Sequence, residues 1–538
     1  MWASSLRISV LARFQTYSHL TNGQCAIDKN YSCEDLMKPV KSSTLNALNF
    51  DQAATNEAQT WRNLLPPEPW LDIVAKYPQK FGAYTRFRLE TGVSNAPSVV
   101  SRARKPHQQT RPVPIVGIPE RIAYRALCDQ VLDATAPTDR SQEAYQEFIA
   151  GPIRAAFKGR RVMPLSATSI LYVVESDITA FYEYVDHFRL FGELQLRTST
   201  VELPRHLVQL LTEVQGRPFG LPQLLDPSDD LSEVYARIIE RQLRRRGIDV
   251  WRYNDDFRIA AETYEEAQAH VEALAHEASV IGLVLNERKT RIVKFRNYFW
   301  KNWLETPSEG DVEFKPELIK ISSDYGELDV DELAAVAHQT FARLDSEPDT
   351  QDHLDPADLT PEDNRDLSRA IGILTTQEDS FGLSHVAKLF EYASHLSPRL
   401  GMYLVTLHEA GEDVGPTWDT LITRSDFFNA WQRVWLVYIA RVCKLLTSPS
   451  RHAWIQSQRM DIDPLLRAEA TLALAPYKLA DFDEIDRAIR AEPEALIPWY
   501  ALAAKAIPNV NQNRLRALKE SHGLIEVLLY KPPKRQTK

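Results

Sequence analysis

The chain has 538 residues, of which 44% are hydrophobic and 25% are charged, and its formal net charge is −10. This length predicts two or three domains, and this composition excludes a disordered or fibrous protein. No run of about 18 uncharged apolar residues occurs, so no membrane partner is expected. The cysteines are too few and too scattered for a disulfide framework or a paired-cysteine zinc site, which fits a reducing cytoplasm; they are Cys25, Cys33, Cys128 and Cys443.

Residues 1–100 are predicted to form an N-terminal extension of mixed character. The first 27 residues contain Arg7 and Arg13 and no acidic residue. Organelle transit peptides share this feature, but an ordinary N-terminal helix is the favoured interpretation. Further on, the Pro-rich sequence LPPEPW at Leu65–Trp70 predicts a break between two elements.

Strand-like and helical patterns alternate in residues 101–305. Within them, WRYNDDFRIA (Trp251–Ala260) places Asp255 beside Asp256 in an otherwise strand-like run. Asn254-Asp255 is ordinary turn chemistry, so the stretch predicts a β-hairpin with these residues at its tip. Taken alone, these residues favour a simple turn over a functional site.

A third carboxylate, Asp177, follows the β-rich run Leu171–Val174. If it met Asp255 and Asp256, three negative charges would share one small space, which is strongly unfavourable unless cations neutralise them. Mg²⁺ suits such a site because it binds one or two carboxylates together with substrate phosphates. Two such ions can activate an attacking 3′ hydroxyl and stabilise a leaving pyrophosphate; Mn²⁺ is the alternative ion.

Three basic clusters lie in the same region. SRARKPHQQTR (Ser101–Arg111) and RAAFKGRR (Arg154–Arg161) are candidates for binding a triphosphate or a strand backbone, and the alternative for each is a solvated face. RQLRRRGI (Arg241–Ile248) is interpreted as structural, because its arginines precede Gly247 at a predicted helix end.

Residues 306–538 are predicted to be almost wholly helical. Apolar residues recur there at spacings of three and four, and Ser425–Leu446 is apolar on most faces, as in a buried helix. Short helices in series predict a stacked array, although no repeat signature is legible and a plain helical domain is the alternative. The segment Asp345–Asp366 holds nine acidic residues and one basic residue, a net of −8, so the rest of the chain is near −2. We expect it to be a solvated loop that leaves basic patches elsewhere.

The order of several motifs resembles that of reverse transcriptases. YNDD in a hairpin, with DITAFY upstream, is similar to motifs C and A of that family. The remaining motifs follow in the family's order, from the fingers motif through motifs B and D to the primer grip: RPVPIVGIPERIAYRAL, GLPQLLDPSDDLSEVYARII, IGLVLNERKTRIV and NYFW. The resemblance covers residues 101–305. It implies an α+β fold, with the fingers and palm of a right-hand polymerase followed by the all-α, repeat-like region.

The resemblance assigns catalytic roles to four residues. It implies that Asp177 and Asp255 ligate the metal ions, with Asp256 as the third carboxylate. Lys289 matches the motif D lysine, a candidate proton donor to pyrophosphate, and its alternative is a solvated charge at a helix end.

Substrate-binding roles follow in the same way. Tyr182 matches the aromatic gate that excludes a nucleotide 2′ hydroxyl, and its alternative is a core aromatic. Gln223 matches a motif B residue near the nascent base pair. The basic residues expected to contact substrate phosphates are Arg104, Arg111, Arg121 and Lys158.

Motif B departs from the family pattern. Related enzymes usually follow LPQ with Gly and another small residue, whereas this chain has Leu224 and Leu225, followed by the acidic residues Asp226, Asp229 and Asp230. Bulk and negative charge there predict hindrance of a template backbone. The alternative is that both leucines pack against the palm.

A reverse-transcriptase core followed by a helical tail resembles the bacterial defence-associated enzymes of the abortive-infection, AbiK type. That resemblance implies antiphage defence, homo-oligomers, dNTP substrates and a DNA product, with synthesis that lacks a conventional template or starts from the protein itself. Two alternatives stay open. One is a templated enzyme that uses a dedicated non-coding RNA, and the other is a catalytically idle scaffold that binds nucleic acid.

Overall fold

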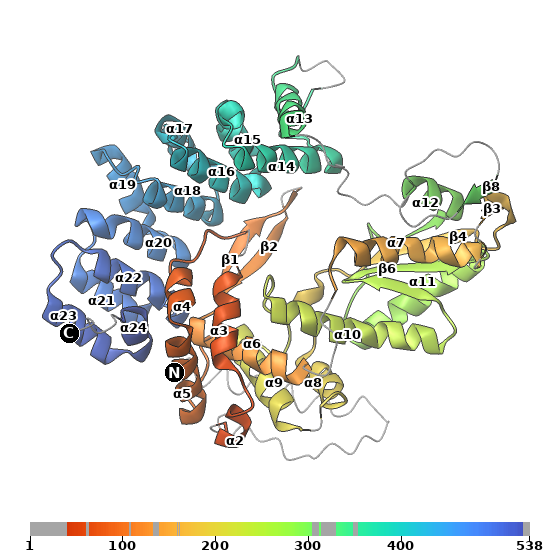
Figure 1. The fold of residues 1–538 in the computed structure, drawn as a ribbon, viewed down its shortest axis with the longest axis horizontal. Coiled ribbons are helices and arrows are strands. Elements are labelled where there is room, and N and C mark those ends of the chain that lie inside the picture. The colour runs from red at the N-terminus through yellow and green to blue at the C-terminus, as the bar shows by residue number, and fades with distance from the viewer. Residues whose placement is uncertain are drawn as a thin grey trace, which may run out of the picture. The chain divides into compact units, whose positions relative to one another are not determined.

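The computed structural model is mostly helical, with small sheets (Figure 1). It describes residues 40–60, 64–106, 109–132, 139–158, 160, 162–198, 200–303, 311–313, 330–347 and 353–530. The expected helix in the first 27 residues lies outside the described residues. No helix among those described has the length and apolar character needed to cross a membrane.

Among the described residues, four helices precede the first strand, and two of them pack against the region that follows. They are α2 (Ser42–Leu45), α3 (Phe50–Gln59), α4 (Leu71–Lys76) and α5 (Pro78–Thr91). The predicted break at Leu65–Trp70 separates α3 from α4 and is confirmed. Helices α3 and α5 both pack on α6 (Ile118–Leu132), which is buried on most of its faces. The N-terminal residues therefore share a hydrophobic core with the region that carries the motifs.

A β-hairpin leads into α6. Strands β1 (Val99–Arg104) and β2 (Thr110–Ile115) are antiparallel, with Ala103 opposite Arg111. The basic residues Arg104 and Arg111 lie in this hairpin, but Arg104 is opposite Thr110, so the two side chains point to opposite faces.

The central sheet has four antiparallel strands in the order β5-β6-β4-β7. Their bounds are β4 (Tyr172–Asp177), β5 (Val250–Tyr253), β6 (Asp256–Ala261) and β7 (Arg291–Lys294). Successive side chains of a strand point to opposite faces. Accordingly, Val173 packs in one core with α7 (Gln142–Phe157) and α12 (Phe295–Lys301), whereas Val174 belongs to the larger core that contains α10 (Asp226–Arg245) and α11 (Tyr264–Val280). Helices thus cover both faces and leave the strand ends for chemistry.

Smaller elements complete this half of the chain. They are α8 (His187–Gln195), α9 (Glu202–Gln215), and the paired strands β3 (Val162–Pro164) and β8 (Asp311–Glu313). The arginine-rich end of α10 is structural, as predicted. Gly247 adopts a left-handed conformation (φ 77°) just after the helix, and Arg246 forms an ion pair with Glu277.

The C-terminal region is a series of helices, and alternate members stack on one another, α14 on α16, α16 on α18, and so on to α24. This arrangement confirms the predicted stacked array. The helices are α13 (Val330–Ala342), α14 (Pro361–Thr376), α15 (Val386–Tyr392), α16 (Ser397–Glu409), α17 (Gly415–Thr423), α18 (Ala430–Val442), α19 (Pro449–Gln458), α20 (Pro464–Leu474), α21 (Phe482–Ala491), α22 (Ile497–Ala506), α23 (Gln512–Ser521) and α24 (Gly523–Leu528).

Two expectations for this region need correction. The buried helix predicted for Ser425–Leu446 spans only α18, because Asn429 caps its N-terminus in a capping box. The acidic segment is not wholly a loop, because Thr360 and Asp363 form a second capping box and α14 begins at Pro361.

Candidate metal centre

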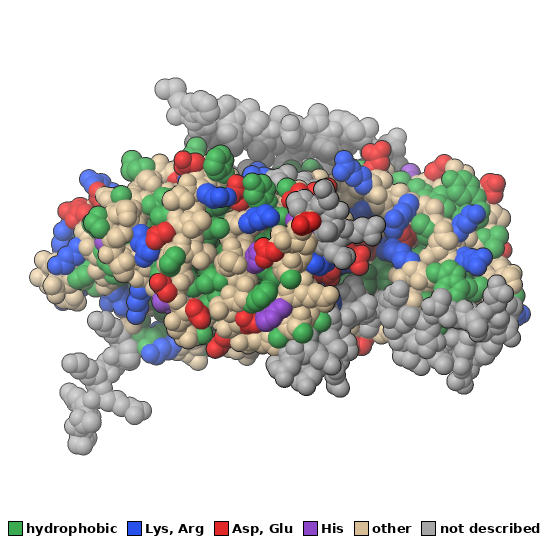
Figure 2. Space-filling view, turned by 90° about the horizontal axis from the view of Figure 1, so that it is seen from above, with side chains coloured by type: hydrophobic (Ala, Val, Ile, Leu, Met, Phe, Trp, Pro, Cys, Tyr) green, Lys and Arg blue, Asp and Glu red, His purple; other side chains and the backbone are tan. Residues whose placement is uncertain are grey.

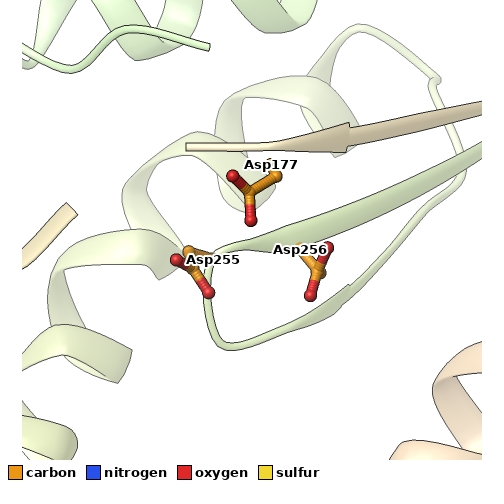
Figure 3. A group of neighbouring side chains, drawn as sticks. All are labelled: Asp177, Asp255 and Asp256. Carbon is orange, nitrogen blue, oxygen red and sulfur yellow. The ribbon is translucent and has the colours of Figure 1, made fainter. Parts of the chain in front are cut away.

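Three carboxylates meet at one end of the central sheet (Figure 3). Asp177 is the last residue of β4 and lies opposite Asp256 in the strand register. Tyr253 pairs with Asp256, which leaves Asn254 and Asp255 as the two-residue turn of the β5–β6 hairpin, and Asn254 has φ 53°. One carboxylate oxygen from each aspartate lies within 4.8 Å of the others. The predicted hairpin is confirmed, and it brings the three acids together.

Burial makes this crowding more costly. Asp177 is only 5% exposed. Burial and the charge of Asp177 raise the pKa of Asp255. Burial, together with the two neighbouring carboxylates, raises the pKa of Asp256 to about 6, against the lowering effect of Arg258. Oxygen donors with this excess of negative charge fit Mg²⁺ or Mn²⁺, so the residues present suit the ion that the sequence predicts.

Residues of the loop before β7 contact Asp177 directly. Asn286 donates from its backbone N–H to the Asp177 carbonyl at 2.7 Å and from Nδ2 to Oδ2 at 3.0 Å. Lys289 Nζ lies 2.8 Å from Asp177 Oδ1. Burial opposes the charge of Lys289, but this hydrogen bond and the three carboxylates raise its pKa. Sequence reasoning placed Lys289 at the site and missed Asn286, although the Leu-Asn pair of the motif D match pointed to it.

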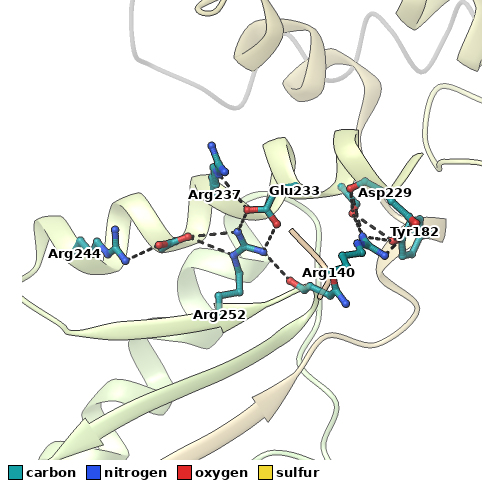
Figure 4. A network of polar contacts seen from close by, with 10 residues as sticks. Arg140, Tyr182, Asp229, Glu233, Arg237, Arg244 and Arg252 are labelled. Carbon is teal, nitrogen blue, oxygen red and sulfur yellow. Dashed lines mark hydrogen bonds and ion pairs between the residues drawn. The ribbon is translucent and has the colours of Figure 1, made fainter. Parts of the chain in front are cut away.

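A second polar network surrounds the Tyr182 hydroxyl (Figure 4). This hydroxyl donates to Asp229 Oδ1 at 2.7 Å and accepts a hydrogen bond from Arg140 at 3.0 Å. Burial and the charge of Asp229 raise the pKa of Tyr182 to about 12. The charge of Arg140 also lowers the pKa of Asp255, so Arg140 connects this network to the carboxylates. Arg140 was not predicted, because no motif contains it.

Figure 4 also shows the polar contacts that hold α10 against the β5–β6 hairpin. Arg252 on β5 donates to Glu233 of α10 at 2.8 Å and to the carbonyl of Asn254 at 3.0 Å. The hairpin turn and the motif B helix are therefore held together beside the carboxylates. A bidentate contact of this kind fixes geometry as well as adding energy.

The motif B turn has an unusual backbone. Gln223 lies half-buried in this turn, and Leu224 has φ 65°, a conformation suited to glycine, the residue expected there from the reverse-transcriptase pattern. Leu225 is only 2% exposed, so it packs in the core. The expected negative charge is partly cancelled, because Asp226 pairs with Arg125 at 2.7 Å and Asp229 with Arg140 at 3.1 Å.

The β1–β2 hairpin brings basic side chains toward the carboxylates. Arg104 and Arg111 lie on its two strands, and Lys105 follows Arg104. Burial and the charge of Arg111 lower the pKa of Lys105. The charges of Lys289 and Asp177 also act on that pKa, which places Lys105 near the metal centre.

Two predicted phosphate-binding residues lie elsewhere. Arg121 is 3% exposed, forms ion pairs with Glu57 and Glu68, and lies over the Trp70 ring, so it is a core residue of α6. Lys158 follows the end of α7 and pairs with Glu262 at 3.6 Å.

The length of strand β6 shows that Lys158 lies far from the carboxylates. Glu262 comes just after β6, and Asp256 begins that strand. At ~3.3 Å per residue, the six intervening steps put Lys158 roughly 20 Å from the carboxylates. The NYFW match is also mainly structural: it lies in α12, where Tyr298 and Phe299 are buried and the Tyr298 hydroxyl donates to the Ile149 carbonyl.

The known proteins that this chain resembles are only distantly similar to it. No protein-family model and no curated protein matches it. Among solved structures, it is similar to telomerase from Candida albicans in complex with the TWJ fragment of telomeric RNA, with 11% identity, 62% of each chain covered and a TM-score of 0.31. The same complex from Candida tropicalis gives 10% identity, 65% of each chain and a TM-score of 0.30.

Apo telomerase from Candida tropicalis matches 76% of this chain and 68% of its own, with 10% identity and a TM-score of 0.30. The chain thus spans less than two thirds of the first two neighbours. At these TM-scores we draw no conclusion about activity from them.

Proposed function

We propose that the chain is a DNA polymerase of the reverse-transcriptase type, which adds deoxynucleotides at the centre formed by Asp177, Asp255 and Asp256. The observation that carries the proposal is the meeting of these acids within 4.8 Å at a strand end and a hairpin turn. Among the described cations, Lys289 alone forms an ion pair with Asp177. A fold gains nothing from such crowding unless cations complete the site.

The three aspartates would hold divalent ions, which when bound supply a polarised 3′ hydroxyl and a stabilised pyrophosphate. Asn286 keeps the Asp177 carboxylate oriented through its two hydrogen bonds. Lys289 Nζ is protonated at neutral pH and lies at the same carboxylate, where it can bind a phosphate oxygen or release a proton to the leaving group.

Other residues would position the nucleotide. Lys105, on the β1–β2 hairpin near the centre, adds positive charge for a triphosphate, and we propose that Arg104 and Arg111 act with it. Tyr182 is held at its hydroxyl by Asp229 and Arg140, so its ring has a fixed position from which to exclude a 2′ hydroxyl. Gln223 would contact the nascent pair from the motif B turn.

The proposal also concerns whether synthesis uses a template and how it is primed. Leu224 and Leu225 both pack against the core, and Asp226 and Asp229 are paired, so untemplated or protein-primed synthesis rests on the family resemblance rather than on bulk or charge in the motif B turn. The templated enzyme and the idle scaffold are the competing functions. The antiphage role, the homo-oligomer and the cytoplasmic location rest on the family resemblance alone.

The experiment uses purified, RNA-depleted protein with Mg²⁺ and labelled dNTPs, with and without an added primer and template. We expect wild-type protein to incorporate label and folded Asp255→Asn to lose incorporation by at least about a thousandfold, since one metal ligand and one charge are removed. The matched control is Asp249→Asn, an exposed aspartate just before β5, which should retain activity.

The product then separates the alternatives. Protein-linked DNA of random or single-base composition supports untemplated synthesis, and faithful copies that require an added template support the templated enzyme. Incorporation by Asp255→Asn at the wild-type rate, or none by folded wild-type protein under any of these conditions, would contradict the proposed function.

A further inference from the structure

A cavity of about 1090 Å³ lies between the tip of the β1–β2 hairpin and the first helices of the C-terminal array. Pro106 of the hairpin tip forms one side. One face of α14 forms another, with Arg365, Ser368, Arg369 and Gly372 at the three- and four-residue spacing of a helix face. The cavity is separate from the three aspartates.

Positive charge dominates the lining. Arg365 and Arg369 come from α14 and Arg399 from α16, and no aspartate or glutamate is among the lining residues that the structure describes. Arg365 and Arg399 are exposed, and neither forms an ion pair with a described carboxylate. The guanidinium groups of Arg365 and Arg399 can therefore pair with an anionic ligand.

The two helices present their arginines to the same space. A Cβ on Gly372 of α14 would lie 3.6 Å from Arg399 Nη1, so Arg399 reaches across to the floor of the cavity. Two acidic residues of α14, Asp363 and Asp366, pair with Arg343, and neither lines the cavity.

The concentration of positive charge at the cavity is a local feature. Figure 2 shows basic and acidic side chains interspersed over the face that it views, without a broad basic surface. The cavity also has apolar walls, formed by Leu333, Ile373 and Leu396. Guanidinium groups beside apolar surface suit a flexible strand, whose phosphates need positive charge and whose bases need apolar contact.

One short piece of chain lies beside both the cavity and the candidate metal centre. Pro106 lines the cavity, and Lys105, the residue before it, lies close enough to Asp177 and Lys289 for their charges to act on its pKa. A strand that leaves the aspartates past Lys105 therefore meets the arginines of α14 next.

We propose that Arg365 and Arg399 bind the phosphate backbone of single-stranded DNA, the strand that emerges from the metal centre. The identification of this strand as product rests on the proposed function, whereas the binding itself does not. Charge complementarity favours a polyanion, and continuity with a DNA-synthesising centre selects DNA over RNA. The site would retain the growing strand between additions.

The test measures binding without synthesis. The full-length chain carrying Asp255→Asn is titrated against a fluorescein-labelled 12-mer of single-stranded DNA, and anisotropy is followed at several salt concentrations. We expect Arg365→Glu/Arg399→Glu to weaken binding by at least about tenfold and to make the slope of log K against log salt shallower by roughly 1.4, since ~0.7 is expected per lost contact to a single strand.

The matched control is Arg516→Glu on α23, whose side chain is 79% exposed and already pairs with Glu520. It should leave affinity and slope unchanged. Equal affinity and slope for the cavity variant and the control, or a loss that affects an RNA 12-mer but not the DNA, would overturn the proposal.

A second measurement separates this proposal from the proposed function. With Asp255 intact, the cavity variant should still add a first nucleotide but make shorter products. If wild-type protein makes no DNA while the cavity variant still loses DNA binding, the polymerase proposal fails and the cavity stands as a DNA site. If synthesis proceeds and product length is unchanged in the variant, the cavity proposal fails alone.

Discussion

Two buried clusters of charged side chains in this protein differ in their balance of acidic and basic groups. In the first, Glu57 of α3 binds both Arg121 and Arg125 of α6, and Arg121 also binds Glu68. Acids and bases are matched there, and the cluster joins the N-terminal helices to α6. Its cost of burial is offset by ion pairs and hydrogen bonds, so the fold itself accounts for it.

In the second cluster, Asp177, Asp255 and Asp256 face one another with one neighbouring lysine, and the side chain of Lys289 is 61% exposed. Burial, followed by the neighbouring carboxylates, raises the pKa of Asp255 and Asp256. The comparison teaches that burial of charge does not by itself indicate function. What distinguishes the second cluster is that its three carboxylates outnumber the described cations paired with them, which are Lys289 at Asp177 and Arg258 at Asp256.

The largest predicted effect comes from breaking the balanced cluster. Glu57→Gln leaves two buried arginines short of a counter-charge, so the free energy of unfolding should fall by about 3–5 kcal/mol. Asp255→Asn removes repulsion and should leave this free energy unchanged or higher in buffer with EDTA. Chemical denaturation of both variants measures the contrast. A similar fall in the free energy of unfolding in both variants would contradict the proposed difference in charge balance between the two clusters.

The network of Arg140, Tyr182 and Asp229 lies between these extremes, because its charges are paired around a group with a proposed substrate role. Tyr182→Ala should lower discrimination between dNTP and rNTP by at least about tenfold, or about 1.4 kcal/mol, because the clash with the 2′ hydroxyl is removed. Tyr184→Ala, at an exposed tyrosine, is the control. Competition between the two nucleotides reports the ratio. Unchanged discrimination in a folded variant would make Tyr182 a core aromatic.

A smaller effect is expected at the motif B turn beside the unbalanced cluster. Leu224 has φ 65°, which costs a residue with a side chain about 1 kcal/mol or more relative to glycine. Both Leu224→Gly and Leu224→Ala lose the apolar contacts of leucine, so their difference isolates the backbone. The glycine variant should be the more stable by about 1 kcal/mol, which reverses the usual order. An alanine variant as stable as the glycine variant would show that the turn is not strained.

The smallest predicted effect is a shift in melting temperature with pH. The pKa of Asp256 is about 6 in the folded chain, above its ordinary value of 3.8, so the folded chain binds this proton more tightly than the unfolded chain. Wild-type stability in EDTA should therefore fall as the pH rises from about 4 to about 6, and Asp256→Asn should lack this component. Mg²⁺ should raise the melting temperature of wild-type protein at pH 8 more than that of the variant. Parallel curves would contradict a charge-crowded site.

Local chemistry made part of this site predictable. Asn254-Asp255 is a turn signal between two strand-like runs, and a carboxylate after a β-rich run identified Asp177, so the hairpin and the strand end followed from sequence. The break before α4 and the end of α10 at Gly247 were likewise predictable from local sequence.

Long-range partners were not predictable in this way. Arg121 lies in a motif-like sequence, but its role depends on Glu57 and Glu68, which come from a different part of the chain. Lys158 is basic and exposed, yet strand β6 separates it from the carboxylates. Arg140 belongs to no motif and became visible only through its contact with Tyr182.

The most direct test of the central claim is a count of bound cations. Electron paramagnetic resonance of Mn²⁺, with a non-hydrolysable dNTP present and Mg²⁺ as competitor, measures the ions held by the folded chain. We predict two Mn²⁺ ions per wild-type chain, displaced by Mg²⁺, a marked loss in Asp255→Asn, and wild-type binding in Asp249→Asn. Equal Mn²⁺ binding by wild-type protein and Asp255→Asn would contradict the assignment of the three aspartates as a metal centre.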